Sequence, residues 1–299
     1  MKRLTLTSLA VLLCAASCLA QASGNVAYSN EGRGQSRAEQ NERNKRAAAD
    51  VASQTGMFID ASVLANVKAD EHVAVFGVTA ECAAVPECGQ KVDAAVASFT
   101  RDVRQLGVAP DDVFVDFVAQ NKIYAYQIEG NIAREKLVGF ELKKNVLVHY
   151  KDRLLLDKLV VAASRSDIFD LIKVDYVVRD PAAVQSRLAE EAARVVREKA
   201  ARYEKLLGKR MLPAQVYADK PSIYYPTEMY DSYTAQESEQ INQDYYSNRE
   251  RYTVQRARKS RTFFFNALTA DNFDHVINPV VTEPVVQFTL YLKVRYEMP

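Results

Sequence analysis

The chain has 299 residues, 48% of them hydrophobic, and its 39 basic side chains nearly balance its 38 acidic ones. A chain of this length can bury a substantial core, either as one elaborated domain or as two small ones. The nearly neutral net charge argues against a nucleic-acid-binding protein, which would carry a basic face or stripe.

Residues 1–22 have the pattern of an export signal. Two basic residues precede an apolar run that is too short to span a bilayer comfortably, and residues 20–22 (Ala-Gln-Ala) fit the small-x-small rule for cleavage before Ser23. A competing interpretation is lipid attachment at Cys18, although the usual large aliphatic residue three positions earlier is missing. We therefore expect an exported protein with no transmembrane segment in the mature chain.

Residues 23–56 are polar and poor in large apolar side chains. Mixed charges with Asn, Gln and Gly predict a flexible polar leader, which accommodates at most a frayed helix from Ser36 to Ala52. The leader is either a tether to an envelope surface or partner, or an unpacked terminus.

Two cysteines, Cys82 and Cys88, remain once the export signal has been removed. An exported chain folds in an oxidising compartment, and a short gap containing Pro86 can close a small loop, so we predict a disulfide rather than two free thiols. The spacing does not match a C-x-x-C redox motif, and no nearby cysteine or histidine completes a zinc set.

Strand and helix patterns alternate from about residue 67 onward. Residues 72–82 are apolar or small at both alternating sets of positions, as in a strand buried on both faces. The segments that follow are a helix over 88–106, a strand from Val113, a strand over 138–150 that forms a long hairpin with it, a helix over 153–164 and a strand over 172–178. This order predicts an α+β fold with a split β-α-β-β-α-β antiparallel sheet and both helices on one face.

The stretch from Pro181 to Gly208 predicts a long third helix, with Asp180 as its N-cap and Gly208 as a left-handed stop. Its apolar residues recur every three or four positions and form one stripe. They are Val184, Leu188, Ala192, Val195, Tyr203 and Leu206. We expect this helix to lie against a sheet assembled from segments on both sides of it, including C-terminal strands.

Several segments within residues 67–217 and 284–297 follow one another in a recognisable order: HVAVFGVTAE, RQLGVAPDDVF, IYAY, VGFELKKNVLVHYKD, IKVDYVVRD, KLLGKRM and VVQFTLYLKVRYE. In this order the chain resembles the SIMPL-domain family of exported bacterial proteins, which includes periplasmic immunogenic proteins and outer-membrane-associated antigens. The resemblance implies a periplasmic or outer-membrane-associated α+β protein that self-associates and is linked loosely to envelope integrity or oxidative stress. It implies no active-site residues, because no catalytic motif defines the family.

The resemblance predicts one domain over residues 57–299 with a tyrosine-rich insertion at about 217–283. Half of the 16 tyrosines lie between 217 and 252. Tyrosine combines a large contact area with a polar tip, so the insertion is either a recognition surface or a long loop that packs its rings on its own domain. The candidate partner contacts are Tyr224, Tyr225, Tyr230, Tyr233, Tyr245 and Tyr246.

No motif in the chain indicates catalysis. The histidines His72, His149 and His275 are more simply explained as structural side chains, and Asp111 and Asp112 as caps in a turn. The nucleophile-elbow, zinc-protease, Walker and dinucleotide-binding patterns are missing from the sequence. We therefore predict a protein that is not an enzyme and that needs neither cofactor nor metal.

Two functions remain open at this stage, and a hydrolase with a dispersed site has the least support. The favoured one is an exported homo-oligomer that self-assembles and contacts cell-envelope components, including an envelope protein partner. The alternative is a periplasmic ligand- or peptide-binding module that uses the tyrosine-rich insertion.

Overall fold

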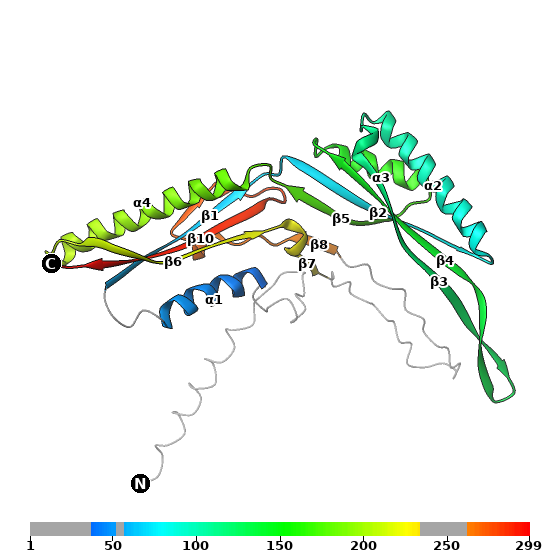
Figure 1. Ribbon diagram of the computed structural model, residues 1–299, viewed down its shortest axis with the longest axis horizontal. Coiled ribbons are helices and arrows are strands. Elements are labelled where there is room, and N and C mark those ends of the chain that lie inside the picture. Colours follow the sequence, from blue (N-terminus) through cyan, green and yellow to red (C-terminus); the bar gives the residue numbers. More distant parts are fainter. Residues whose placement is uncertain (1–36, 52–56, 234–261) are drawn as a thin grey trace, which may run out of the picture. The chain divides into compact units, whose positions relative to one another are not determined.

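The computed structural model describes residues 37–51, 57–233 and 262–299 (Figure 1). The expected signal at 1–22, with Cys18, lies outside the described residues, so cleavage and lipid attachment stay predictions. Nearly all described residues belong to one compact unit, Ser36–Tyr230 with Phe265–Pro299. Most of strands β7 (Tyr230–Tyr233) and β8 (Thr262–Phe265) belongs to a second unit, in which they pair as a two-stranded sheet.

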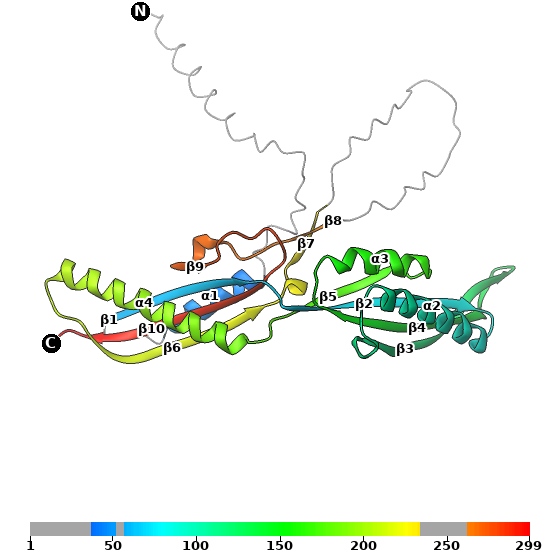
Figure 2. The same cartoon turned by 90° about the horizontal axis from the view of Figure 1, so that it is seen from above.

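The first sheet of the larger unit has the predicted split arrangement. Its strands pair antiparallel in the order β3-β4-β2-β5, and helices α2 and α3 cover one face (Figures 1 and 2). Its elements are β2 (Glu71–Cys82), α2 (Val85–Gln105), the short turn η2 (Pro110–Asp112), β3 (Val113–Glu129), β4 (Ile132–Tyr150), α3 (Leu155–Arg165) and β5 (Asp170–Val177). The α+β prediction is confirmed.

Apolar residues at strand and helix spacing form the core of this sheet. Phe76 of β2 and Phe99 of α2 are fully buried, and their rings meet edge to face with centroids 5.0 Å apart. Val146 and Val148 of β4 and Leu159 of α3 are completely buried in the same cluster. Because side chains alternate along a strand, the same period that buries these residues exposes their neighbours on the other face.

A second sheet packs against the long helix, as expected, although the sequence patterns did not identify all of its strands. Its strands pair in the order β6-β10-β1-β9. They are β1 (Met57–Val67), β6 (Leu212–Tyr224), β9 (His275–Ile277) and β10 (Val286–Glu297). β1 and β10 pair antiparallel along their whole lengths, from Met57 opposite Tyr296 to Val67 opposite Val286.

Helix α4 (Pro181–Leu207) covers one face of this second sheet (Figures 1 and 2). Asp180 caps its start by accepting the Ala183 N–H at 2.9 Å, and Gly208 ends it with φ 63°. The expectation that the helix lies against strands from both sides of it in the chain is confirmed, since β1 precedes it and β6 and β10 follow it. The first sheet contributes little to the surface that packs under α4, because α2 and α3 already cover the apolar face of the first sheet.

Part of the expected leader is a packed helix. Helix α1 (Arg37–Val51) has buried Ala38 and Glu42 side chains and contacts the second sheet. The Glu42 carboxylate accepts hydrogen bonds from the Tyr224 hydroxyl at 2.7 Å and from the Thr289 hydroxyl at 2.8 Å. The sequence allows a frayed helix at this place in the leader; helix α1 is packed, and buried polar contacts rather than an apolar stripe hold it.

The tyrosine-rich insertion begins later than residue 217. Residues 212–224 form β6, which pairs with β10 across the second sheet. Strand β9 and the turn η4 (Ala270–Asn272) lie within the same expected insertion and pack on the larger unit, with β9 joining β1 in parallel pairing. Residues 234–261 lie outside the described residues.

Candidate functional site

Strands β3 and β4 continue beyond the four-stranded sheet as a hairpin, here called the arm (residues 123–139). The last pairing of β2 with β4 joins Cys82 to Phe140, and from Ile123 opposite Gly139 onward β3 and β4 pair only with each other among the described residues. At Gly139 an added Cβ would stand 2.8 Å from the Cys82 carbonyl oxygen. Glycine is therefore required where β2 ends and the arm begins.

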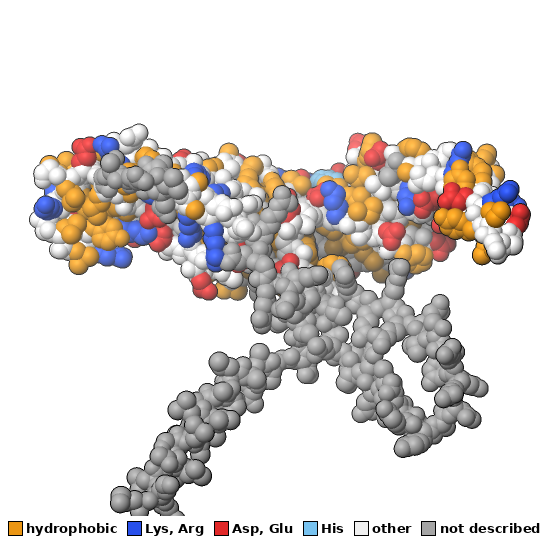
Figure 3. Space-filling view, turned by 90° about the horizontal axis from the view of Figure 1, so that it is seen from below, with side chains coloured by type: hydrophobic (Ala, Val, Ile, Leu, Met, Phe, Trp, Pro, Cys, Tyr) orange, Lys and Arg blue, Asp and Glu red, His pale blue; other side chains and the backbone are white. Residues whose placement is uncertain are grey.

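The arm exposes large apolar side chains to solvent. Tyr126 is 71% exposed and Ile128 is 75% exposed, and both share a face with Tyr124 and Leu137, which pair in register. In Figure 3 hydrophobic side chains (orange) lie exposed among charged ones at the right of the view, the place of the arm in Figure 1. A two-stranded hairpin is marginally stable alone, and large exposed apolar patches are uncommon on single soluble chains.

The six candidate tyrosines do not form one surface. Tyr224 is only 6% exposed, because helix α1 covers it and its hydroxyl contacts Glu42, so it must be removed from the candidate partner contacts. Tyr225 and Tyr230 flank the turn η3 (Pro226–Glu228) and are partly exposed. The side chain of Tyr233 is not described, and Tyr245 and Tyr246 lie outside the described residues.

Cys82 ends β2 and Cys88 lies in the first turn of α2, where the two are neighbours and both are buried free thiols in this structure. The Cys88 sulfur lies 3.4 Å from the carbonyl oxygens of Ala80 and Phe140. Burial, together with the adjacent Cys82 thiol, raises the pKa of Cys88 to about 11. The disulfide stays a prediction, and the structure places its two partners side by side.

His149 lies between two carboxylates at one end of the first sheet. Its Nδ1 is 2.7 Å from Asp112 Oδ1 and its Nε2 is 3.3 Å from Glu71 Oε2, while Arg179 contacts the other oxygen of Glu71 at 2.5 Å. The hydrogen bond with Asp112 raises the pKa of His149, and the Arg179 hydrogen bond lowers the pKa of Glu71. Both ring nitrogens are engaged, so this cluster ties η2, β2 and β4 together. The sequence suggested only a capping role for Asp112.

The other two histidines have structural surroundings. His72 is buried, stacked on Tyr150 and edge to face with Tyr176, with 5.2 Å between ring centroids in each pair. Burial lowers its pKa, which favours the neutral ring. His275 makes a longer contact of 3.7 Å with Glu191 on α4.

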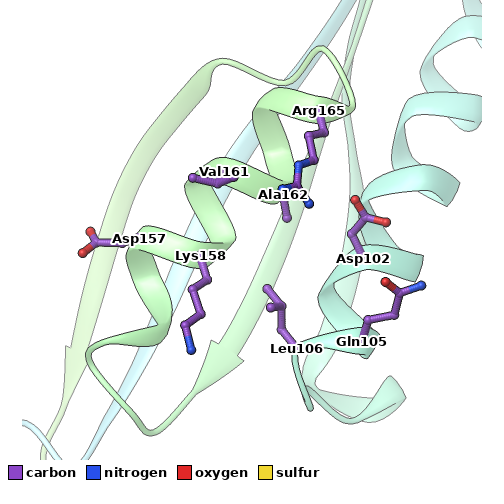
Figure 4. Close-up of a pocket in the computed structure, with 8 residues that line it drawn as sticks. All are labelled: Asp102, Gln105, Leu106, Asp157, Lys158, Val161, Ala162 and Arg165. Atoms are coloured by element: carbon purple, nitrogen blue, oxygen red, sulfur yellow. The ribbon is translucent and has the colours of Figure 1, made fainter.

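A shallow pocket between α2 and α3 has a mixed lining (Figure 4). Its volume is about 360 Å³ and its walls carry Asp102, Gln105, Leu106, Asp157, Lys158, Val161, Ala162 and Arg165. The carboxylates of Asp102 and Asp157 lie at opposite sides of the view and do not converge (Figure 4). The lining holds no histidine, serine or cysteine.

Metal sites and membrane spans are two further kinds of site that the described residues could form. No cluster of three or more His, Cys, Asp or Glu side chains in that part of the chain is arranged to hold a metal ion. Within the same residues, no helix is both long enough and apolar enough to cross a membrane. The arm is therefore the feature that most clearly calls for a functional explanation.

Comparison with known proteins supports the resemblance seen in the sequence. The family model SIMPL, described as "Protein of unknown function (DUF541)", matches residues 59–255, which include both the first sheet and helix α4. No curated protein matches the chain. Because the family model covers well over half of the residues, the chain belongs to the SIMPL family.

Proposed function

We propose that this protein is an exported, non-catalytic SIMPL protein that self-assembles through the arm and acts by contacting cell-envelope components. The observation that carries the proposal is the arm itself, a two-stranded extension whose aromatic and aliphatic side chains meet solvent. Such a surface is unfavourable in water and becomes favourable when a second copy covers it.

The energetics support association of moderate strength. Fully burying one large apolar side chain contributes about 1.5–3 kcal/mol, and association costs roughly 4–15 kcal/mol in lost freedom. Tyr124, Tyr126, Ile128, Ile132 and Leu137 are all exposed in the single chain. Because these side chains are already partly buried, covering all of them contributes roughly 4–9 kcal/mol, which is comparable with the lower part of that cost.

The export pattern of residues 1–22 supports a periplasmic or outer-membrane-associated location. The link to envelope integrity or oxidative stress comes from the family resemblance, and it makes an envelope protein the expected partner of the assembled form. Fractionation of cells into cytoplasm, periplasm and outer membrane, followed by immunoblotting, tests the location. Recovery in the cytoplasmic fraction would reject it.

Light scattering after size-exclusion chromatography tests the assembly. The exported chain should elute well above the mass of one copy, and the double variant Tyr126→Lys with Ile128→Lys should elute as a monomer. Val280→Lys is the matched control, because Val280 is 80% exposed and lies outside the arm. Monomeric unaltered protein at micromolar concentration would contradict the proposal, as would unchanged assembly in the double variant.

The peptide-binding alternative retains one supporting observation. Tyr225 and Tyr230 are partly exposed on either side of η3, as expected of a recognition surface. Deleting residues 234–261 together with the changes Tyr225→Ala and Tyr230→Ala tests this alternative without removing any part of β6. Loss of an envelope partner from a pull-down with assembly retained would favour the binding module, whereas retention of the partner would reject it.

A further inference from the structure

Strand β2 has an unpaired edge along its second half. On one side it pairs with β4 as far as Cys82, but on the other side β5 pairs with it only as far as Gly77, opposite Asp170. Residues 78–82 therefore present one edge to which no strand of the described chain is bonded. An open strand edge has main-chain N–H and C=O groups available to an added strand.

This edge forms one wall of a groove of about 560 Å³. The second wall is one side of α2, where small residues leave room for the side chains of an occupant, and residues 165–167 close one end. The lining residues are Val78, Thr79, Ala80, Glu81, Lys91, Val92, Ala94, Ala95, Ser98, Arg165, Ser166 and Asp167. The lining has basic and acidic side chains in equal number, so it does not select an occupant by net charge.

A buried polar atom in the lining also points to an occupant. Ser166 is buried, and in the described part of the chain its hydroxyl has no hydrogen-bond partner. Buried hydroxyl groups are normally paired, because burial without a partner is unfavourable. A strand placed along the β2 edge would bring its own main-chain groups to the end of the groove that Ser166 closes.

The chain itself carries a strand of the required kind. β3 is the outermost strand of the first sheet, so its outer edge is unpaired among the described residues, and within the arm it is extended and apolar. Tyr124, Tyr126 and Ile128 alternate with Ile123 and Ala125, so one set would face the small side chains of α2. The edge of β3 and the edge of β2 are thus complementary in main-chain hydrogen bonding.

We propose that the groove beside residues 78–82 receives the arm of a second copy, whose β3 strand extends the first sheet beyond the point where β5 ends. This inference rests on the proposed self-assembly and specifies its acceptor surface. The contact joins two different surfaces, an arm and a groove, so one copy can supply either without the other.

Complementation between two variants tests the inference. Ala94→Arg fills the groove and leaves the arm unchanged. The double change Tyr126→Lys with Ile128→Lys places charges on the apolar face of the arm and leaves the groove unchanged. Each variant alone should have an apparent dissociation constant raised by about tenfold or more. An equimolar mixture of the two should form a one-to-one dimer in size-exclusion chromatography with light scattering. The Ala94→Arg variant supplies an unaltered arm, and the double variant supplies an unaltered groove.

Controls separate this inference from the proposed function. Ala97→Arg introduces the same side chain on the same helix outside the groove and should assemble normally, and circular dichroism melts verify that every variant folds. If the arm variant is monomeric but Ala94→Arg assembles normally, the groove is not the acceptor and self-assembly stands. If the unaltered chain is monomeric, both proposals fail.

Hydrogen exchange provides a second readout that does not depend on a substitution in the groove. The amides of residues 78–82 that point away from β4 should be protected in the assembled protein and should lose that protection in the arm variant. Equal exchange in the two would overturn the inference. If the protection persists in the monomeric arm variant and disappears on removal of a co-purified peptide, the occupant is another protein's strand and the inference is wrong.

Discussion

At the scale of single residues, the structure assigns support roles to most side chains that the sequence singled out. His72, His149 and Asp112 are held by aromatic or charged neighbours, and Tyr224 is covered by α1. Val195 is buried between α4 and the second sheet, as its place in the stripe predicted, whereas Leu206 in the same stripe is 73% exposed. Periodicity identifies a stripe but not where the partner surface ends.

Val195→Asp should reduce the free energy of unfolding by about 3–5 kcal/mol, because it places an uncompensated charge between α4 and its sheet. Leu206→Asp on the same helix is the control and should cost no more than about 1 kcal/mol. Urea denaturation of both variants measures the difference. Equal stability of the two would show that the stripe around residue 195 is not core.

The His149 cluster should make stability depend on pH in a defined direction. The pKa of His149 is raised above 6.5 in the folded chain, so its contribution is complete below that pH and is lost as the pH rises through the folded pKa. The pKa of Glu71 is lowered below 4.5, so its contribution is present above that pH and is lost on acidification. The combined contribution of His149 and Glu71 to stability is therefore greatest between pH 4.5 and pH 6.5.

Denaturation of His149→Gln at several pH values measures this dependence. The unaltered protein should lose stability as the pH rises above 6.5, and the variant should lack this decline. His275→Gln is the matched control, since that ring makes only a longer contact with one carboxylate. A decline that persists unchanged in His149→Gln would assign it to other groups.

Oxidation of Cys82 and Cys88 should stabilise the protein by about 2 kcal/mol, a small amount because the loop it closes is short. Both thiols are buried, and the pKa of Cys88, raised to about 11, leaves it little thiolate at neutral pH, so the native reduced pair should resist alkylation until urea is added. Mass spectrometry of exported protein, alkylated before and after denaturation, measures both states. Two alkylated cysteines in the exported protein after denaturation without reductant would reject the bridge.

At the scale of elements, the first sheet could be predicted because most of its segments show a clear helix or strand period, and β2, which is apolar at both sets of positions, is followed directly by a well-marked helix. β1 could not, since Ile59, Ala61, Val63, Leu64 and Ala65 are all buried and the segment therefore lacks alternation. Helices α4 and α1 both pack near β1, so both of its faces are covered. A strand of this kind beside a polar leader gives no periodic signal.

The packing of helix α1 and the existence of the groove were also beyond sequence reasoning, for different reasons. The contacts of α1 join Glu42 to Tyr224 and Thr289, which are far apart in the chain and meet only when the second sheet is complete. The groove exists because β5 is shorter than β2, and boundaries of that kind are not visible in a hydropathy pattern. The long hairpin was predicted, but its exposure was not, because an apolar strand has the same pattern whether it is buried or free.

At the scale of the whole molecule, the larger unit contains two four-stranded sheets and a hairpin that extends beyond one of them. The fold accounts for the apolar stripe of α4 and for the α2 and α3 faces, and it leaves the arm without a covering layer within the described residues. Since the chain provides both an exposed strand and an open strand edge, association between copies completes what a single copy leaves unpaired.

The most direct test of this account is sedimentation velocity of the exported chain beside a chain whose arm is shortened. Replacing residues 124–138 by Asn-Gly joins Ile123 to its pairing partner Gly139 through a two-residue turn and keeps the rest of the sheet. The account predicts that the exported chain sediments as an assembly at micromolar concentration and that the shortened chain sediments as a folded monomer. Identical sedimentation of the two chains would contradict it.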